Sequence, residues 1–237
     1  MSKKGKGFFV TGTGTGVGKT VIAGALVRLL QKHGLKAGAM KPVESGCLRR
    51  DGAPFPQDGS FLREISGMDE GLAEMTPYAF EAPLAPMVAA EMENTRIEPG
   101  VIMEKFERLS GKYGAMIVEG AGGLLVPLRD DFFVIDLARA LALPLVIVAK
   151  AGLGTVNHTL LTVRCALSEG LEVAGVILNR TGPEEGLAEK TNPDVLKKFS
   201  PVPVLGVFPC LGQVTADSIE RAADCIETGT LKSFFFD

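Results

Sequence analysis

The stretch Gly12-Thr13-Gly14-Thr15-Gly16-Val17-Gly18-Lys19-Thr20 decides the fold of this chain. It follows the short apolar run Gly7–Gly12 and leads into Thr20–His33, where apolar residues have helical spacing. Glycines let the backbone curl so that its N–H groups face a phosphate, and the start of a helix adds positive potential there. A lysine at the end of such a loop reaches the β- and γ-phosphates, and the hydroxyl after it usually binds Mg²⁺. The stretch therefore predicts a nucleotide phosphate loop.

The alternative for this stretch is a glycine-rich turn with a lysine directed into solvent. Gly12 and Gly18 are separated by five residues, whereas the common phosphate-loop pattern has four residues between its glycines. The four glycines, the final Gly-Lys-Thr, the strand before and the helix after nevertheless favour the phosphate loop.

Strand-like and helix-like segments alternate along the chain. The expected strands are short and apolar without interruption, which is typical of a parallel sheet covered on both faces. These strands are Gly7–Gly12, Leu35–Met40, Ala115–Glu119, Leu145–Ala149, Val173–Leu178 and Val202–Val207. The expected helices are Thr20–His33, Asp58–Ile65, Gly100–Leu109, Val134–Ala142, Thr155–Glu169, Ala188–Phe199 and Ala216–Glu227. We expect one doubly wound α/β domain over residues 1–237, with ligands at the carboxyl ends of the strands.

Composition and charge exclude several classes of function. The net charge of −3 argues against a broad nucleic-acid surface, which is usually basic. The apolar region Leu137–Ile147 is interrupted by Arg139 and Pro144, and it is shorter than the about 20 residues that span a bilayer. The apolar run Phe8-Phe9-Val10 is too short for a signal peptide. We therefore expect a cytoplasmic enzyme that binds neither nucleic acid nor membrane.

The cysteines and histidines give no metal-binding pattern. The four cysteines lack a C-x-x-C spacing, and the chain has two histidines, so a structural zinc site is not expected. We expect Cys47, Cys165, Cys210 and Cys225 to be reduced and mostly buried.

Charged residues follow two of the other expected strands. Lys41 ends one strand beside the phosphate loop, where it could hold an anionic reacting group; taken alone, a lysine at this position is more often a surface lysine. Glu119 ends the most apolar strand, where a carboxylate must be paired or bound to a metal because burying it alone is costly. Asp58 and Thr155 each stand at the start of an expected helix, and each could simply be its N-cap.

Four motifs in series resemble those of the dethiobiotin synthetases, from Phe8 to about Leu211 without large gaps. They are the phosphate loop with its five-residue spacing, Lys41-Pro42-Val43-Glu44-Ser45-Gly46, Glu119-Gly120-Ala121-Gly122-Gly123, and Gly152-Leu153-Gly154-Thr155-Val156-Asn157-His158. The resemblance implies ATP-dependent carboxylation of 7,8-diaminononanoate with CO₂ and ring closure to dethiobiotin, through a carbamate and a carbamic-phosphoric anhydride. It also implies Mg²⁺ as cofactor and a homodimer with substrate at the two-fold interface.

The same resemblance assigns roles to individual residues. Lys41 and Lys19 are the catalytic lysines, and Thr20, Asp58 and Glu119 bind Mg²⁺. Substrate contacts fall on Ser45 and, for the distal carboxylate, on Gly154, Thr155, Val156 and Asn157. Asn179 pairs with the adenine edge. The full set for nucleotide and metal is Gly16, Val17, Gly18, Lys19, Thr20, Val21, Asp58, Glu119, Gly120, Ala121, Gly122, Asn179, Pro209, Cys210 and Leu211.

Two positions depart from the pattern of that family. Arg180 follows Asn179 where the family often has aspartate, which weakens any statement about base selectivity. Gly16 stands where several members have an acidic residue, so a metal or amine contact from that side chain is absent here.

Three rival classes fit the sequence less well. A GTPase would carry Asn-Lys-x-Asp, whereas this chain has Asn179-Arg180-Thr181-Gly182. A MinD/ParA ATPase has an additional lysine near the start of its loop, which is missing from Thr13 to Gly16, and the apolar end Phe234-Phe235-Phe236 is too short for a membrane helix. A cobyrinic acid diamide synthase needs an amidotransferase domain that 237 residues cannot contain.

Overall fold

The protein has a central parallel sheet. The computed structural model describes residues 6–183 and 186–234. Within these residues the main sheet has six parallel strands in the order β12-β11-β10-β1-β7-β2, so β1 lies inside the sheet. Its strands are β1 (Gly7–Gly12), β2 (Ala37–Met40), β7 (Ala115–Glu119), β10 (Leu145–Lys150), β11 (Val173–Asn179) and β12 (Val204–Phe208). The predicted doubly wound α/β class is confirmed.

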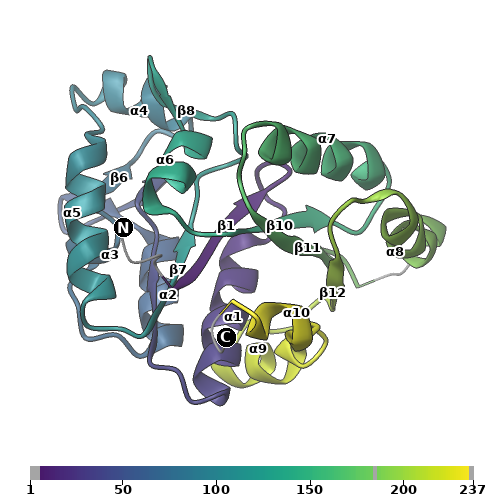
Figure 1. Cartoon of the computed structure of the whole chain (residues 1–237). Helices are drawn as coiled ribbons and strands as arrows, with labels where there is room; N and C mark the ends of the chain where they lie inside the picture. Colours follow the sequence, from purple (N-terminus) through teal and green to yellow (C-terminus); the bar gives the residue numbers. More distant parts are fainter. Residues whose placement is uncertain (1–5, 184–185, 235–237) are drawn as a thin grey trace.

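Helices cover both faces of this sheet, as its apolar strands predicted. Figure 1 shows α1, α9 and α10 on one side of the sheet and α6 and α7 on the other. The helices are α1 (Lys19–Lys32), α2 (Gln57–Ser66), α3 (Leu72–Met75), α4 (Pro86–Met92), α5 (Pro99–Ser110), α6 (Val134–Leu141), α7 (Thr155–Ser168), α8 (Leu187–Phe199), α9 (Ala216–Ala223) and α10 (Thr228–Lys232). In the described part of the chain, none of them is long and apolar enough to cross a membrane.

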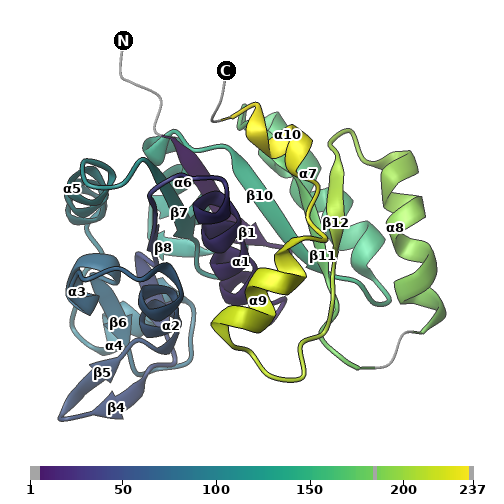
Figure 2. The same ribbon diagram turned by 90° about the horizontal axis from the view of Figure 1, so that it is seen from below.

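Several short elements were not predicted from the sequence. β3 (Val43–Ser45) pairs in parallel with β6 (Tyr78–Phe80), and β4 (Leu48–Arg50) forms a hairpin with β5 (Ala53–Phe55). Figure 2 shows this hairpin projecting beside α2. A second hairpin joins β8 (Pro127–Arg129) to β9 (Phe132–Phe133). Strands of two or three residues are too short to give an alternating pattern that can be distinguished from a loop.

Some local predictions are wrong. The expected helix Ala216–Glu227 ends at Ala223, and a separate helix, α10, follows. Asp58 is not an N-cap: Pro56 holds that position, and Asp58 lies in the first turn of α2. Thr155 is not an N-cap either, because Gly154, in a left-handed conformation, precedes α7.

The cysteine prediction also fails in part. Cys47 is buried and Cys165 half-buried, but Cys210 and Cys225 are exposed. All four are free thiols, because no two of them form a disulfide.

Near the C-terminus, the Phe234 ring packs edge-on against Phe8 with centroids 5.4 Å apart, whereas Phe235 and Phe236 lie outside the described residues.

The core supports the carboxyl edge of the sheet. Buried side chains of the sheet and its helices form one main hydrophobic cluster that extends from Phe8 to Leu231. A smaller cluster around Ile147 and Val176 lies under α7 and α8. Val10 is in register with Glu119, and Met40 with Val118. The ends of β1, β7 and β2 therefore meet at one edge of a packed sheet.

Candidate active site

A cavity of about 760 Å³ lies at the carboxyl ends of β1, β7 and β2. These strands are neighbours, so the segments that follow them converge although they are far apart in the sequence. The residues around the cavity are Thr15, Gly16, Gly18, Lys19, Thr20, Lys41, Val43, Glu44, Ser45, Asp58, Pro83, Leu84, Ala85, Pro86, Glu119, Ala121, Gly122 and Val126. The structure thus brings together most of the residues predicted for phosphate, metal and catalysis.

The phosphate loop holds its lysine inside the loop rather than in solvent. Lys19 is 7% exposed, and its Nζ donates to the carbonyl of Gly14 at 3.0 Å. Burial, together with the positive charge of Lys41, lowers the pKa of Lys19 to about 8. A bound anion would favour the charged form of this lysine. The arrangement excludes the alternative of a turn with a solvent-facing lysine.

The end of β11 anchors the phosphate loop. The buried side chain of Asn179 donates from Nδ2 to the carbonyl of Val17 at 2.9 Å. Gly18 has a φ of 90°, and a Cβ at this position would lie 2.0 Å from the same Nδ2 atom. A side chain at Gly18 would therefore be strained and would displace Asn179. This contact of Asn179 with the loop was not predicted from the sequence.

Lys41 joins two carboxylates in the cavity. Its Nζ lies 2.5 Å from Oε1 of Glu119 and 3.1 Å from Oδ2 of Asp58. The Thr20 hydroxyl donates to the same Glu119 oxygen at 3.0 Å. Lys41 and Glu119 are buried, whereas the Asp58 side chain is 41% exposed. The alternative of Lys41 as a surface lysine is therefore wrong.

Burial and charge oppose each other in this cluster. Burial lowers the pKa of Lys41, but the charges of Glu119 and Asp58 outweigh burial and hold that pKa above its ordinary value. Burial raises the pKa of Glu119, and the positive charge of Lys41 only partly opposes this. Lys41 is consequently a permanent cation at neutral pH.

Glu119 has an oxygen that could receive a further cation. Its Oε2 is buried and, among the described residues, has no hydrogen-bond partner. Two lysines and three carboxyl groups line the cavity, the latter from Glu44, Asp58 and Glu119, so acidic side chains outnumber basic ones there. No group of three or more His, Cys, Asp or Glu side chains in the described part of the chain could hold a metal alone. A metal that needs few protein ligands would fit the Thr20 hydroxyl and the carboxylates of Asp58 and Glu119.

Other predicted site residues do not line the cavity. Val17 is buried, Val21 packs against the core, and Gly120 is buried next to Phe9 and Val134. The turn at Gly154–Asn157 begins α7, outside the cavity, with Thr155 buried and Asn157 exposed. Pro209–Leu211 follows β12 at the far edge of the sheet, where Cys210 is exposed.

Sequence reasoning missed two parts of the cavity. Glu44 is buried beside Ser45, and no role was predicted for it from the sequence. A carboxylate that follows an apolar residue just before a turn nevertheless indicates a group that needs hydrogen-bond or charge partners. The wall Pro83–Pro86 was missed entirely, although Pro86 at the first position of α4 is a recognisable helix start. The Ser45 hydroxyl donates to the carbonyl of Leu84 at 2.8 Å, which connects this wall to the predicted substrate residue.

Comparison with known proteins gives the family. A family model described as an AAA domain matches residues 6–218. The chain is 43% identical over 225 residues to the ATP-dependent dethiobiotin synthetase BioD of Thermodesulfovibrio yellowstonii, covering 92% of this chain and 94% of the relative. It is 47% identical over 204 residues to the protein of the same name from Anaeromyxobacter dehalogenans strain 2CP-C, covering 86% and 90%. The chain belongs to the dethiobiotin synthetase family. The family expected from the four motifs is thereby confirmed.

Solved structures agree on the fold of this dethiobiotin synthetase family member. The septum site-determining protein MinD from Pyrococcus horikoshii, complexed with Mg-ADP, has a TM-score of 0.53 at 18% identity, covering 91% of this chain and 86% of that one. The MinC:MinD cell division complex of Aquifex aeolicus gives a TM-score of 0.52 at 15% identity, covering 96% and 95%. At such identities the likeness concerns the P-loop fold alone, so it gives no support to the rival MinD-like function.

Proposed function

We propose that this chain is an ATP-dependent dethiobiotin synthetase, a cyclo-ligase of biotin biosynthesis. Its substrates are 7,8-diaminononanoate, CO₂ and ATP. The observation that carries the proposal is the convergence of Lys19, Lys41 and Glu119 in one cavity, in a chain 43% identical to a named synthetase. Phosphoryl transfer depends mainly on positioning and on neutralising charge, and two buried lysines suit that task.

The reaction needs two bond-forming steps after carbamate formation. One amine of the substrate adds to CO₂ and loses a proton, which gives a carbamate. A carbamate oxygen then bonds to the γ-phosphorus of ATP and releases ADP, forming a carbamic-phosphoric anhydride. The second amine attacks the carbonyl carbon and loses a proton, the C–O bond to phosphate breaks, and phosphate leaves as the ureido ring closes. Lys19 binds the β- and γ-phosphate oxygens. Lys41 neutralises the negative charge on the oxygens of the carbamate and of the γ-phosphate where the two groups meet.

Mg²⁺ is the proposed cofactor, bound by the Thr20 hydroxyl and by the carboxylates of Asp58 and Glu119. The unpartnered Oε2 of Glu119 and the excess of acidic over basic side chains around the cavity support this assignment. Mg²⁺ is commonly bound by one or two carboxylates together with waters and substrate phosphates. When bound, the ion would neutralise charge on the phosphate oxygens.

For the substrate we propose a binding site that a second subunit completes. Ser45 contacts the reacting end, and the start of α7 at Gly154–Asn157 binds the distal carboxylate across a homodimer interface. α7 has glycine as N-cap and no side-chain cap, so its positive end suits an anion. Leu153, just before this turn, is 96% exposed, as an interface residue would be in an isolated subunit.

The proposal also includes further nucleotide contacts, a single domain and a cytoplasmic location. Asn179 and Pro209–Leu211 lie near the nucleotide base, and Gly120, Ala121 and Gly122 border the phosphates. The chain acts as one domain, supported by the main cluster of buried side chains that extends from Phe8 to Leu231. The cytoplasm is its proposed location because its nucleotide substrate is available there.

One assay tests the proposed activity. Phosphate release from ATP is measured with bicarbonate, with and without 7,8-diaminononanoate, and ¹⁴C from bicarbonate is followed into an acid-stable product. We expect phosphate release and label incorporation at equal rates, both dependent on the diamine. Phosphate release at the same rate without the amine, or without stable incorporation, would refute the proposal.

A further inference from the structure

Glu44 connects β3, the short strand that follows Lys41, to α2, the helix that carries Asp58. Its Oε1 accepts from the backbone N–H of Asp58 and its Oε2 from that of Gly59, both at 3.0 Å. Glu44 lies in β3 and is 6% exposed. One buried carboxylate therefore satisfies two N–H groups in the first turn of α2, a turn whose N-cap, Pro56, gives no side-chain cap.

Asp58 depends on its backbone for its position. Its side chain is 41% exposed and forms an ion pair in the cavity with Lys41 at 3.1 Å. An exposed carboxylate has rotamer freedom, so its approach to Lys41 requires that its Cα be held in place. The hydrogen bond from the Asp58 N–H to Glu44 provides this at the residue itself.

The opposite side of the same helical turn is fixed as well. A Cβ at Gly59 would lie 2.2 Å from Oγ1 of Thr76, so the turn packs closely against that residue. The preceding residue, Met75, accepts a backbone hydrogen bond from Lys41 at 2.9 Å. Both residues of the Lys41–Asp58 ion pair are thus held by one set of contacts: Lys41 by its backbone hydrogen bond to Met75, and the turn at Asp58 by Thr76 and by the carboxylate of Glu44.

The hydrogen bonds of Glu44 also determine where its charge acts. Both oxygens are directed to backbone N–H groups, so Lys41 is left to Glu119 and Asp58. A carboxylate free to turn toward Lys41 would compete with these two for the same ammonium group. The contacts of Glu44 therefore keep Asp58 and Glu119 arranged around one cation.

We propose that Glu44 is a positioning residue for the metal and phosphate site, acting through Asp58. The inference rests on the proposed function for the role of Asp58 as a Mg²⁺ ligand. Residues that orient the ligands of a metal commonly change metal affinity by about 10- to 100-fold when they are replaced. Glu44 has the geometry of such a residue without contacting the reacting atoms.

The test measures binding of the fluorescent nucleotide mant-ATP against Mg²⁺ concentration, without the amine substrate. We expect Glu44→Ala to raise the Mg²⁺ concentration for half-maximal enhancement by about 10-fold or more. Affinity for metal-free mant-ATP should stay within about twofold, because the phosphate loop is untouched. Glu44→Gln keeps the size of the side chain and one acceptor oxygen, so it should have an intermediate effect, and it decides the test if Glu44→Ala unfolds.

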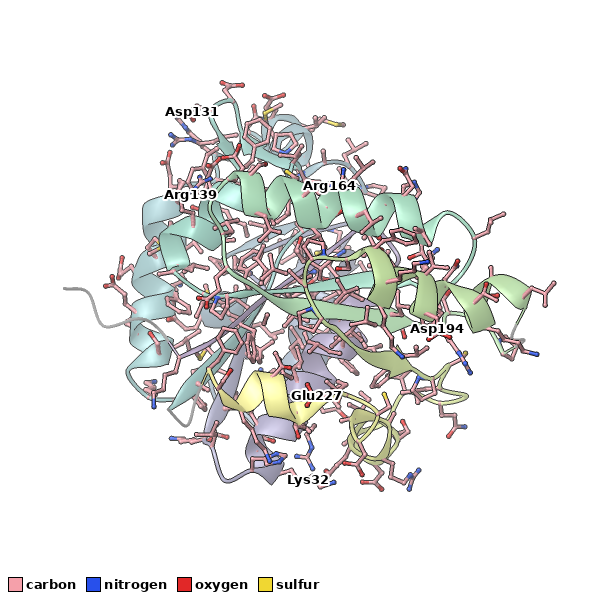
Figure 3. The ribbon with its side chains drawn as sticks, turned by 45° about the vertical axis from the view of Figure 1, so that its right-hand side comes forward. Lys32, Asp131, Arg139, Arg164, Asp194 and Glu227 are labelled. Atoms are coloured by element: carbon pink, nitrogen blue, oxygen red, sulfur yellow. The ribbon has the colours of Figure 1, made fainter. Side chains whose placement is uncertain are left out.

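A matched control comes from Glu227, whose carboxylate accepts from the N–H groups of Gly229 and Thr230 at the start of α10. Figure 3 shows Glu227 on the side of the sheet opposite Arg139 and Arg164, and it does not line the cavity. Glu227→Ala should lower the melting temperature without changing the Mg²⁺ dependence. An equal change in Mg²⁺ dependence in both alanine variants, or none in the Glu44 variants, would overturn the inference.

A double variant separates action through Asp58 from a general loss of structure. In an Asp58→Asn background, Glu44→Gln should change the Mg²⁺ dependence little, because the ligand it orients is gone. Additive effects would contradict the role assigned to Glu44. Failure of the wild-type protein to use the diamine would refute the proposed activity, whereas the nucleotide-binding test would still decide the role of Glu44.

Discussion

The ammonium group of Lys41 lies 2.5 Å from Oε1 of Glu119, which joins the ends of the neighbouring strands β2 and β7. Both side chains are buried, so each charge relies on the other for the interactions that water would otherwise supply. Such a pair adds little net stability, but removing one partner leaves an unpaired buried charge. The pair therefore serves the chemistry of the cavity more than the stability of the fold.

Replacing Lys41 by alanine should lower kcat by about 100-fold or more, because a charge contact made mainly in the transition state is lost. The dissociation constant of ATP should change by no more than about threefold, since Lys19 and the loop remain. Calorimetric titration with ATP and steady-state kinetics give the two quantities. Lys150→Ala is the matched control, because Lys150 is an exposed lysine at the end of β10. A large loss of ATP affinity with normal kcat would contradict the assignment.

The same variant should be less stable. Breaking a buried ion pair costs about 3–5 kcal/mol, because Glu119 remains in the core with one partner fewer. Urea unfolding measures this difference, and Lys41→Met, which keeps most of the aliphatic stem, separates lost packing from lost charge. A loss of stability in Lys41→Ala that Lys41→Met fully restores would mean that packing alone is responsible.

Replacing Glu119 by glutamine should leave the fold intact and remove most of the turnover. The amide keeps the shape of the side chain, but it removes the negative charge proposed to bind Mg²⁺. Turnover is measured as Mg²⁺ is raised to saturation, with circular dichroism to check folding. Near-normal turnover at saturating Mg²⁺ would refute the metal assignment.

The sequence predicted the main sheet well because the order of its elements follows from local patterns. Continuous apolar runs and the phosphate loop identified β1, β7 and β10, and their bounds differ by at most one residue from the structure. The region between Val43 and Phe80 could not be predicted in the same way. Its four strands have three residues each, too few to show an alternating pattern. β4 and β5 form a local hairpin, whereas β3 pairs with β6, whose residues lie 35 positions later in the sequence, a non-local pairing.

The sequence predicted which residues form the candidate site, but it did not predict the hydrogen bonds that connect them to the rest of the fold. Lys41 and Glu119 are recognisable because a charged side chain at the end of an apolar strand is costly to bury unless it is paired or bound. That Glu44 binds the N–H groups of α2, and that Asn179 reaches the carbonyl of Val17 from two strands away, depend on packing across the sheet. Such contacts join residues far apart in the chain, so they give no recognisable spacing of residues in the sequence.

Asn179→Ala should weaken the binding of ATP and of GTP by the same factor, about 5- to 10-fold. The change removes a buried hydrogen bond to the phosphate loop, which costs roughly 1–1.5 kcal/mol and affects every nucleotide alike. Direct titration of the variant with both nucleotides measures the two factors. If Asn179 instead acts mainly on adenine, ATP binding will weaken while GTP binding stays unchanged.

The thiols should differ widely in their reactivity with a disulfide reagent at pH 8. Burial, together with the negative charge of Glu44, raises the pKa of Cys47 to about 12, so about one molecule in 10⁴ carries the thiolate at this pH. Because the thiolate is the nucleophile, reaction of Cys47 should remain slow and should accelerate as the pH rises. Of the two exposed cysteines, Cys225 has a sulfur whose partial burial raises its pKa to about 11, so Cys210 should react first and Cys210→Ser should remove the fast phase. A fast phase that persists in Cys210→Ser and disappears in Cys47→Ser would contradict this order.

The proposed homodimer makes Leu153 the most informative position for the substrate tail. Its side chain is 96% exposed in the single subunit, next to the turn proposed to bind the distal carboxylate. Leu153→Glu should shift sedimentation toward monomer and raise KM for the diamine, with little change in ATP binding, because only the tail contact crosses the interface. Leu187→Glu, at an 82% exposed leucine at the start of α8, is the matched control and should do neither. Asn157→Ala should raise KM for the diamine while the dimer persists, since it removes a carboxylate contact without adding charge. A wild-type protein that sediments as a monodisperse, fully active monomer would refute the shared site.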